Sequence, residues 1–404
     1  MTMHDAQVHF HSLSFVPEGG GVLVGRPDTE SYAVFPPDGA DLLQHMVNGM
    51  TPTEAAEWYG TTYGEPIDMA EFVVTLEDLG FTRAADEQQV TGPPVRWQRL
   101  ARALYSRTAF ACYVGLVAAW VVTVGRHPEI APNPRHVFFT SSLLIAQVTI
   151  VASQIGFLFM HEAAHVLAGK RIGLPSSLGI GQRMYAVVFE TRMNGLLSVP
   201  RRQRYLPFLS GMMVDVLLIC GLGLLAAATR GSDGSMPLIG RFALASGFPI
   251  IIRIIWQFLL FQRTDLYYVF CTMLGCYDLH AATRTLVCNQ FWRTLGKEER
   301  VVDEGHWTDR DRQIARWYAP FAAIGLALLT MIMVLIVIPL GTVFVHLLWQ
   351  GLSGDFGLRF WDALGSLLLN SAQILAFVYF TIRNYVRSRR VRSATPAPNL
   401  LGVS

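Results

Sequence analysis

The segment LLIAQVTIVASQIGFLFMHEAAHVLAGK, residues 143–170, decides the fold. A helix needs about 20 apolar residues to cross roughly 30 Å of hydrocarbon at 1.5 Å per residue. The segment belongs to an apolar run over 138–168 and ends at the basic pair Lys170-Arg171. It therefore predicts a membrane-spanning helix that carries the ionisable motif HEAAH (161–165) towards its basic end.

Further apolar runs lie on both sides of this segment. The chain has 404 residues, of which 52% are hydrophobic and 15% charged, a balance typical of a membrane protein. We predict a mainly α-helical polytopic membrane protein of about six transmembrane helices, preceded by a small N-terminal α+β domain of winged-helix type. The predicted spans are 109–125, 138–168, 206–228, 238–262 with an apolar continuation to 274, 318–345 and 358–382.

Basic residues predict the orientation of these spans. Residues 169–205, 263–316 and 383–392 carry seven, eight and five Lys or Arg, whereas the alternate loops carry five in all. The positive-inside rule therefore places both termini in the cytoplasm, as in a multi-pass protein of a bacterial inner membrane. No signal peptide is indicated in residues 1–15, and the five cysteines lie where thiols stay reduced.

The HEAAH motif has the spacing of a catalytic zinc site. Residues four apart share a helix face, so His161 and His165 can bind one zinc ion, with Glu162 beside them. Zinc would polarise an amide carbonyl, and Glu162 would take a proton from metal-bound water. By helical rise His161 lies about 13 Å inside the span, where ionisable groups are costly and mark functional sites. The motif predicts a zinc peptidase with Glu162 as its catalytic residue.

A catalytic zinc usually has three protein ligands, so one more is expected. Asp265 interrupts the fourth apolar run within the sequence RTDLYY, at a depth close to that of the histidines. The alternative for Asp265 is a helix-terminal carboxylate paired with Arg263. Asp278 and His280 compete as ligands but lie nearer the polar loop.

These motifs resemble the site-2 protease group of intramembrane zinc metalloproteases, over roughly residues 138–280. The resemblance rests on HEAAH late in one span and on Asp-Leu-Tyr-Tyr at the end of a later one. It implies that Asp265 is the third ligand. The family's Leu-Asp-Gly is Thr264-Asp265-Leu266 here, which changes the residue expected to allow the local turn.

Asp215 ends a second family-like segment, SVPRRQRYLPFLSGMMVD (198–215). The segment is similar to one that ends in Gly-Pro-x-x-Asn, with Met212 and Asp215 in place of the proline and asparagine. The family's asparagine implies a role in holding the substrate or the developing oxyanion. Three roles stay open for Asp215: a protonated hydrogen-bond donor to the oxyanion, a residue that orients a ligand histidine, or a fourth metal ligand.

The loop between the second and third spans predicts a hairpin. YAVVFETR (185–192) is strand-like, and Asn194-Gly195 is a tight-turn signal before Leu196–Val199. A strand edge there could bind an extended substrate by β-addition, or the hairpin could have no substrate role.

Arg253 is a charged residue within the fourth span. It lies about 18 Å along a helix from Asp265, which places it towards the outer interface, where an arginine extends to the headgroups. The sequence assigns it no chemistry.

Residues 1–94 differ from the rest, with fifteen Asp or Glu and two basic residues. Strands are predicted at 22–25 and 31–35, and helices at 38–48, 52–59 and 68–79. Thr51–Glu54 and Asp68–Glu71 form capping-box patterns, and Gly80 follows the last helix. DNA binding by such a fold requires Lys and Arg, so we expect no nucleic-acid partner.

The runs SYAVFPPDGADLLQHMVNGMTPTEAAEWYG (31–60) and EFVVTLEDLGF (71–81) resemble the PqqD-type recognition domain, which binds leader segments of ribosomally made peptides. The resemblance implies a precursor or leader peptide as partner. The predicted organisation is a recognition domain at 1–90, a linker and juxtamembrane segment at 91–108, a protease domain at 109–382 and a basic tail at 383–404 that contacts anionic lipid. No oligomeric state is predicted.

The combined prediction is an intramembrane zinc metalloprotease that cleaves a precursor peptide delivered by its N-terminal domain. One alternative is a regulatory site-2 protease that cuts a membrane-bound transcription or anti-sigma factor. Another is a catalytically silent protein that binds peptide for transport or immunity, in which Glu162 is dispensable.

Overall fold

The computed structural model describes residues 7–87, 95–183, 186–305, 307–352 and 357–394. The chain groups into two compact units, each described by itself below. The first comprises residues 1–105, 166–177 and 192–207, and the second comprises 106–165, 178–191 and 208–404. Within the described ranges the chain is mainly helical, with short strands in both units.

The N-terminal part of the first unit is a small α+β fold. Strands β2 (Ser14–Glu18), β3 (Gly21–Arg26) and β4 (Ser31–Phe35) form an antiparallel sheet in that order, and β1 (His9–Phe10) pairs with β5 (Thr82–Arg83). Helices α1 (Pro37–Val47), α2 (Pro52–Tyr63) and α3 (Met69–Asp78) follow the sheet in sequence. Their apolar faces enclose a core that includes Phe35, Leu42, Leu43, Leu76 and Phe81.

Local sequence signals explain where these helices begin and end. Thr51 and Glu54 form a reciprocal capping box, and the Asp68 carboxylate accepts from two backbone N–H groups of the first turn of α3. Gly80 adopts a left-handed conformation just after α3. The predicted strands and helices of this region are therefore confirmed. Strand β2, which contains Pro17, and the two-residue strands β1 and β5 were not predicted.

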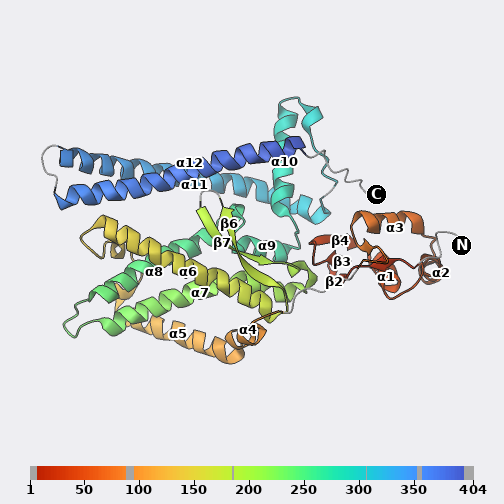
Figure 1. Ribbon diagram of the computed structural model, residues 1–404, viewed down its shortest axis with the longest axis horizontal. Helices are drawn as coiled ribbons and strands as arrows, with labels where there is room; N and C mark the ends of the chain where they lie inside the picture. The colour runs from red at the N-terminus through yellow and green to blue at the C-terminus, as the bar shows by residue number, and fades with distance from the viewer. Residues whose placement is uncertain (1–6, 88–94, 184–185, 306, 353–356, 395–404) are drawn as a thin grey trace. The chain divides into compact units, whose positions relative to one another are not determined.

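Long apolar helices dominate the rest of the chain (Figure 1). They are α5 (Arg107–Arg126), α6 (Leu143–Arg171), α7 (Arg201–Thr229), α8 (Leu238–Gln257), α11 (Asp309–Leu352) and α12 (Leu358–Ala394). Within the described residues, five helices are long and apolar enough to span a membrane: α5, α6, α7, α8 and residues 309–332 of α11. They indicate a membrane protein. Helix α12 covers the range of the sixth predicted span, 358–382, but is not one of these five helices.

The fourth span ends earlier than predicted. Instead of continuing to 274, the chain leaves α8 after Gln257, forms the 3-10 turn η4 (Leu260–Gln262) and starts a new helix, α9 (Asp265–Leu274). Helix α10 (Leu279–Thr294) and the turn η5 (Glu298–Arg300) then precede α11. The remaining short elements are α4 (Gln98–Leu104), η1 (Pro128–Ile130) and η2 (Pro134–Val137).

The hairpin after α6 is present, but its strands are not those predicted. Strand β7 (Ala186–Met193) pairs with the preceding strand β6 (Ser176–Arg183), while Asn194-Gly195 leads into the 3-10 turn η3 (Leu196–Ser198). Two glycines within β6, a residue type depleted in strands, hid it from the sequence pattern. Residues 184–185, between β6 and β7, lie outside the described residues, as do 88–94, around the predicted start of the linker, and the tail beyond 394.

A buried ion-pair cluster joins two parts of the first unit. Glu18, at the end of β2, accepts hydrogen bonds from Arg201 (2.5 Å) and Arg204 (2.8 Å) at the start of α7. Arg204 also donates to the carbonyls of Leu197 and Val199. The Glu18 side chain is 1% exposed, so the N-terminal sheet is fixed to the segment that leads into α7.

Candidate metal centre

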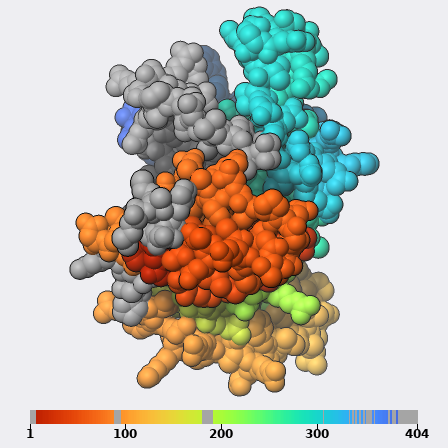
Figure 2. Space-filling model, turned by 90° about the vertical axis from the view of Figure 1, so that its right-hand side faces the viewer, coloured from red at the N-terminus to blue at the C-terminus, as the bar shows by residue number. Residues whose placement is uncertain are grey.

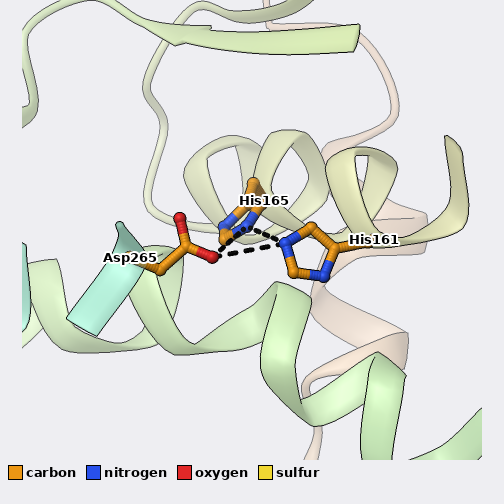
Figure 3. A group of neighbouring side chains, drawn as sticks. All are labelled: His161, His165 and Asp265. Carbon is orange, nitrogen blue, oxygen red and sulfur yellow. Dashed lines mark hydrogen bonds and ion pairs between the residues drawn. The ribbon is translucent and has the colours of Figure 1, made fainter. Parts of the chain in front are cut away.

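Three side chains of the second unit converge on one point: His161 and His165 from α6 and Asp265 from the first turn of α9 (Figure 3). The two Nε2 atoms are 3.2 Å apart. The Asp265 Oδ2 atom is 3.2 Å from Nε2 of His161 and 3.3 Å from Nε2 of His165. The ligand atoms thus form a nearly equilateral triangle, so the structure brings together the three residues predicted as metal ligands.

The dimensions of the triangle fit a zinc ion. Tetrahedral zinc with bonds of about 2.0–2.1 Å has ligand atoms about 3.3–3.4 Å apart. Two imidazole nitrogens and a carboxylate oxygen are also a donor set that zinc favours. Three lone-pair-bearing atoms held at this spacing repel one another unless a cation or shared protons lie among them.

His161 is oriented by a carboxylate behind it. Its Nδ1 lies 3.0 Å from Oδ2 of Asp215 on α7, a residue that is 0% exposed. Asp215 also accepts hydrogen bonds from Nε and Nη2 of Arg253 on α8. A carboxylate bound to arginine is an acceptor, so Nδ1 of His161 donates to Asp215, and Nε2 is the ring nitrogen that faces the triangle.

This contact bears on two sequence expectations. Of the three roles left open for Asp215, the geometry favours orientation of a ligand histidine. The expectation that Arg253 extends to the outer interface is wrong, because its guanidinium turns inward and pairs with Asp215. A charge within a span that has a buried carboxylate partner at hand is stabilised more by pairing than by an extended conformation.

Helix α7 also approaches the second histidine. The Ser210 hydroxyl is 3.3 Å from Nδ1 of His165, where it can accept the proton of that nitrogen. The next residue is Gly211, whose lack of a side chain leaves room for both rings. A Cβ at this position would lie 2.3 Å from Nε2 of His165 and 2.5 Å from Nε2 of His161. Only glycine therefore allows α7 to pass this close to the ligand atoms.

Asp265 reaches the histidines because the backbone turns sharply before it. Arg263 has a left-handed conformation, with φ of 54°, and α9 begins two residues later. The backbone N–H of Asp265 donates to the side-chain oxygen of Gln257, the last residue of α8 (2.9 Å). Leu266, at the family's glycine position, lies within α9, so the turn is made by Arg263 instead.

The competing residues for the third ligand lie elsewhere. Asp278 caps the start of α10 and pairs with Arg263 at 3.0 Å, so Arg263 is not the partner of Asp265 that the alternative interpretation supposed. The backbone N–H of His280 donates to the hydroxyl of Tyr267. Neither residue belongs to the group of convergent ligand atoms.

Glu162 is held by the hairpin rather than by the histidines. The Thr191 hydroxyl, on β7, lies 2.8 Å from Oε2 of Glu162 and 3.0 Å from its backbone carbonyl oxygen. The predicted catalytic carboxylate thus follows the first ligand directly in the chain and has a defined contact of its own. Thr191 was within the strand-like segment, but nothing in the sequence signalled its contact with Glu162.

No protein-family model, curated protein or solved structure matches this chain.

Proposed function

We propose that this protein is an intramembrane zinc metalloprotease that hydrolyses a peptide bond of a precursor peptide. The observation that carries the proposal is the triangle of His161, His165 and Asp265, whose 3.2–3.3 Å edges suit a tetrahedral zinc ion. When bound, zinc would polarise the scissile carbonyl and lower the pKa of a water molecule.

The residues of the chain divide the remaining work among them. His161, His165 and Asp265 would hold the ion, and Asp215 and Arg253 fix the ring of His161. Glu162 accepts the proton of the attacking water and passes it to the leaving amine, so the site needs no other acid or base. Thr191 holds Glu162 in place until substrate binds.

The N-terminal α+β region supplies recognition in this proposal. Its three-stranded sheet and three helices support the predicted winged-helix-like, PqqD-like domain. Strands β2 and β4 are the edge strands of this sheet, where an extended peptide could bind by strand addition. Binding a leader there raises the concentration of the attached substrate at the protease.

The proposed location is a bacterial inner membrane with both termini in the cytoplasm. The distribution of Lys and Arg supports this orientation, since the loops that follow α6 and α9 are the basic ones. The recognition domain and the basic end of α6 then share the compartment in which a precursor peptide is made.

The test compares wild type with Glu162→Gln and Asp265→Ala after reconstitution into liposomes. Zinc per chain is measured by mass spectrometry, and cleavage is measured on a mixture of fluorescence-quenched peptides and on any small peptide found to be encoded beside this gene. We expect about one zinc and cleavage for wild type, zinc without cleavage for Glu162→Gln, and loss of both for Asp265→Ala.

Asp309→Ala serves as the matched control, because it removes an exposed carboxylate at the start of α11 that lies outside the triangle. It should keep zinc and activity. Cleavage by Glu162→Gln at the wild-type rate would overturn the protease proposal and leave a peptide-binding protein with a metal site.

A further inference from the structure

Helix α10 has apolar residues on two opposite faces. On one face Leu279, Ala282 and Leu286 pack into a core with residues of α9 and α11. On the other, Val287, Phe291 and Leu295 are 48%, 56% and 52% exposed. A spacing of four residues places them in one stripe, which runs opposite the packed face. Figure 2 shows this segment, in teal, at the surface of the molecule.

The position of α10 between two apolar helices limits where it can lie. It follows the apolar helix α9 and packs against the first turns of α11, across which it runs (Figure 1). A groove between α10 and α11 is lined by Val287, Phe291, Arg293, Glu304, Arg316 and Pro320. Phe321 and Ile324, in the following turns of α11, are also exposed. Helix α10 therefore adjoins a helix that is itself a candidate membrane span.

The charge of α10 itself is positive. Residues 279–297 include Arg284, Arg293 and Lys297 and contain no Asp or Glu, whereas Glu298 and Glu299 follow directly and Glu304 lies 3.8 Å from Arg293. Lys297 and Arg300 lie over the ring of Trp292, at 5.9 Å and 4.7 Å from its centre. Apolar and aromatic residues beside Lys and Arg are typical of helices that lie in a bilayer surface, where the cations meet anionic headgroups.

We propose that α10 lies in the membrane surface and binds anionic phospholipid. Its stripe of Val287, Cys288, Phe291 and Leu295 enters the boundary between headgroups and acyl chains, and Arg284, Arg293 and Lys297 contact lipid phosphates. The occupant of the exposed face is therefore the bilayer itself. This proposal does not depend on zinc or on proteolysis.

The native residue Cys288 allows a direct test, because it is an exposed thiol on the stripe. A nitroxide is attached to Cys288 in the Cys112→Ser protein, in which the remaining cysteines, Cys220, Cys271 and Cys276, are buried. The protein is reconstituted in vesicles of phosphatidylcholine and phosphatidylglycerol. Collision rates with oxygen, which dissolves in lipid, and with a water-soluble nickel chelate are then measured by electron paramagnetic resonance.

We expect high oxygen and low nickel collision at Cys288, as at Cys112 of α5 labelled in the Cys288→Ser protein, whereas a label on Glu298→Cys, in a protein with both Cys112 and Cys288 replaced by serine, should meet mainly nickel. High nickel collision at Cys288 would overturn the proposal, because the face would then lie in water. Low collision with both reagents would overturn it as well, because protein would then cover the face. Leu295→Cys, on the same stripe, replaces Cys288 if the native thiol does not label.

The charge contribution is tested with Arg284→Gln, Arg293→Gln and Lys297→Gln together. Compared with wild type in the mixed vesicles, the rate of nickel collision at Cys288 should be several-fold higher in the triple variant. It should also be several-fold higher for wild type in vesicles of phosphatidylcholine alone. The matched control replaces Arg284 and Arg293 by lysine and keeps the charge, so its label should stay buried. If the label at Cys288 reached the same depth in vesicles with and without phosphatidylglycerol, the proposal that α10 binds anionic lipid would be wrong.

Discussion

Two buried carboxylates in this chain are held by arginine, and they differ in what else they touch. Asp215 in the second unit pairs with Arg253 and also contacts Nδ1 of His161. Glu18 in the first unit pairs with Arg201 and Arg204, and Arg204 donates its remaining bonds to backbone carbonyls. Asp215 therefore connects Arg253 to a candidate metal ligand, whereas Arg204 connects Glu18 to backbone carbonyl groups. We call these sets of residues the Asp215 group and the Glu18 group.

These contacts indicate two roles for a buried ion pair: one orients a functional side chain, and the other stabilises the fold. Removal of one partner from such a pair leaves an uncompensated charge, which typically costs about 3–5 kcal/mol. Both groups should therefore matter for folding. Only damage to the Asp215 group should also change metal affinity, because a carboxylate bound to a ligand histidine fixes the ring and its proton.

The largest effect is expected for Gly211→Ala, which acts on the histidines without touching either ion pair. The new methyl group would lie 2.3 Å and 2.5 Å from the two ligand nitrogens, so zinc should be lost. Stability should fall, because a methyl group forced against two buried rings typically costs about 1–3 kcal/mol, more than the ~0.5–1 kcal/mol by which a helix interior favours alanine over glycine. Zinc content and unfolding in mixed SDS micelles measure the two effects.

Gly221→Ala on the same helix is the matched control, because a Cβ there meets no atom within 4 Å. It should keep its zinc. Full zinc content in Gly211→Ala would mean that the ion does not lie at the triangle.

The next largest effect is expected for Arg253→Gln. It leaves Asp215 buried without its cation, so we expect a loss of about 3–5 kcal/mol of unfolding free energy and a 10- to 100-fold weaker zinc affinity. Arg253→Lys should recover only part of both, because an ammonium group cannot form the two-pronged contact. Zinc affinity is measured by competition with a chelator.

Arg241→Gln removes an exposed arginine from the same helix and should change neither quantity. An unaltered zinc affinity in Arg253→Gln, together with the expected loss of stability, would place the Asp215 group in the same class as the Glu18 group.

Glu18→Gln should give the complementary result. The variant leaves Arg204, which is 3% exposed, without its anion, and we expect a loss of about 3 kcal/mol. Zinc affinity should stay at the wild-type value. Glu57→Gln, at an exposed position of α2, is the control. A fall in zinc affinity with Glu18→Gln would show that the first unit influences the metal centre.

The smallest effect is expected at a carboxylate with more solvent access. The Tyr59 hydroxyl donates to Asp38, which lowers the pKa of the Asp38 carboxyl and raises the pKa of Tyr59 to about 12. Tyr59→Phe should cost about 1 kcal/mol at pH 7. Because the folded pKa of Asp38 is depressed, this contribution is present above its unfolded pKa of about 3.9 and is lost as the pH falls further.

The raised pKa of Tyr59 acts at the opposite end of the pH scale. Its contribution is fully present below the unfolded pKa of about 10 and is lost as the pH rises towards 12. Unfolding of wild type and Tyr59→Phe between pH 2 and pH 9 should therefore converge at the acid end. A constant difference across that range would contradict the contact.

The sequence was most informative where a single residue type, or a regular spacing of residues, was enough to identify an element or a site. Apolar runs predicted the long helices, and the caps at Thr51 and Asp68 predicted two helix starts. The HEAAH spacing placed His161 and His165 on one face, and an interrupted apolar run singled out Asp265. Each of these inferences needs only local geometry and the cost of charge in hydrocarbon.

What could not be predicted depends on contacts between distant segments. Arg253 was placed by its distance along a helix, which says nothing of the carboxylate on the neighbouring helix. Thr191 and Ser210 are ordinary residues until the fold brings them to Glu162 and His165. Strand β6 contains glycines, and α10 is apolar on two faces, so neither has the simple period that identifies an element.

The polar group around the metal centre also constrains the order of biosynthesis. His161, Asp215, Arg253 and Asp265 come from four successive helices, so the ribosome makes His161 about 90 residues before Arg253. At about 5–20 residues per second, α6 waits roughly 5–20 seconds for the arginine that completes its buried network. During that interval ionisable groups of α6 and α7 would face hydrocarbon alone. We therefore expect α6, α7 and α8 to leave the insertion machinery together rather than singly.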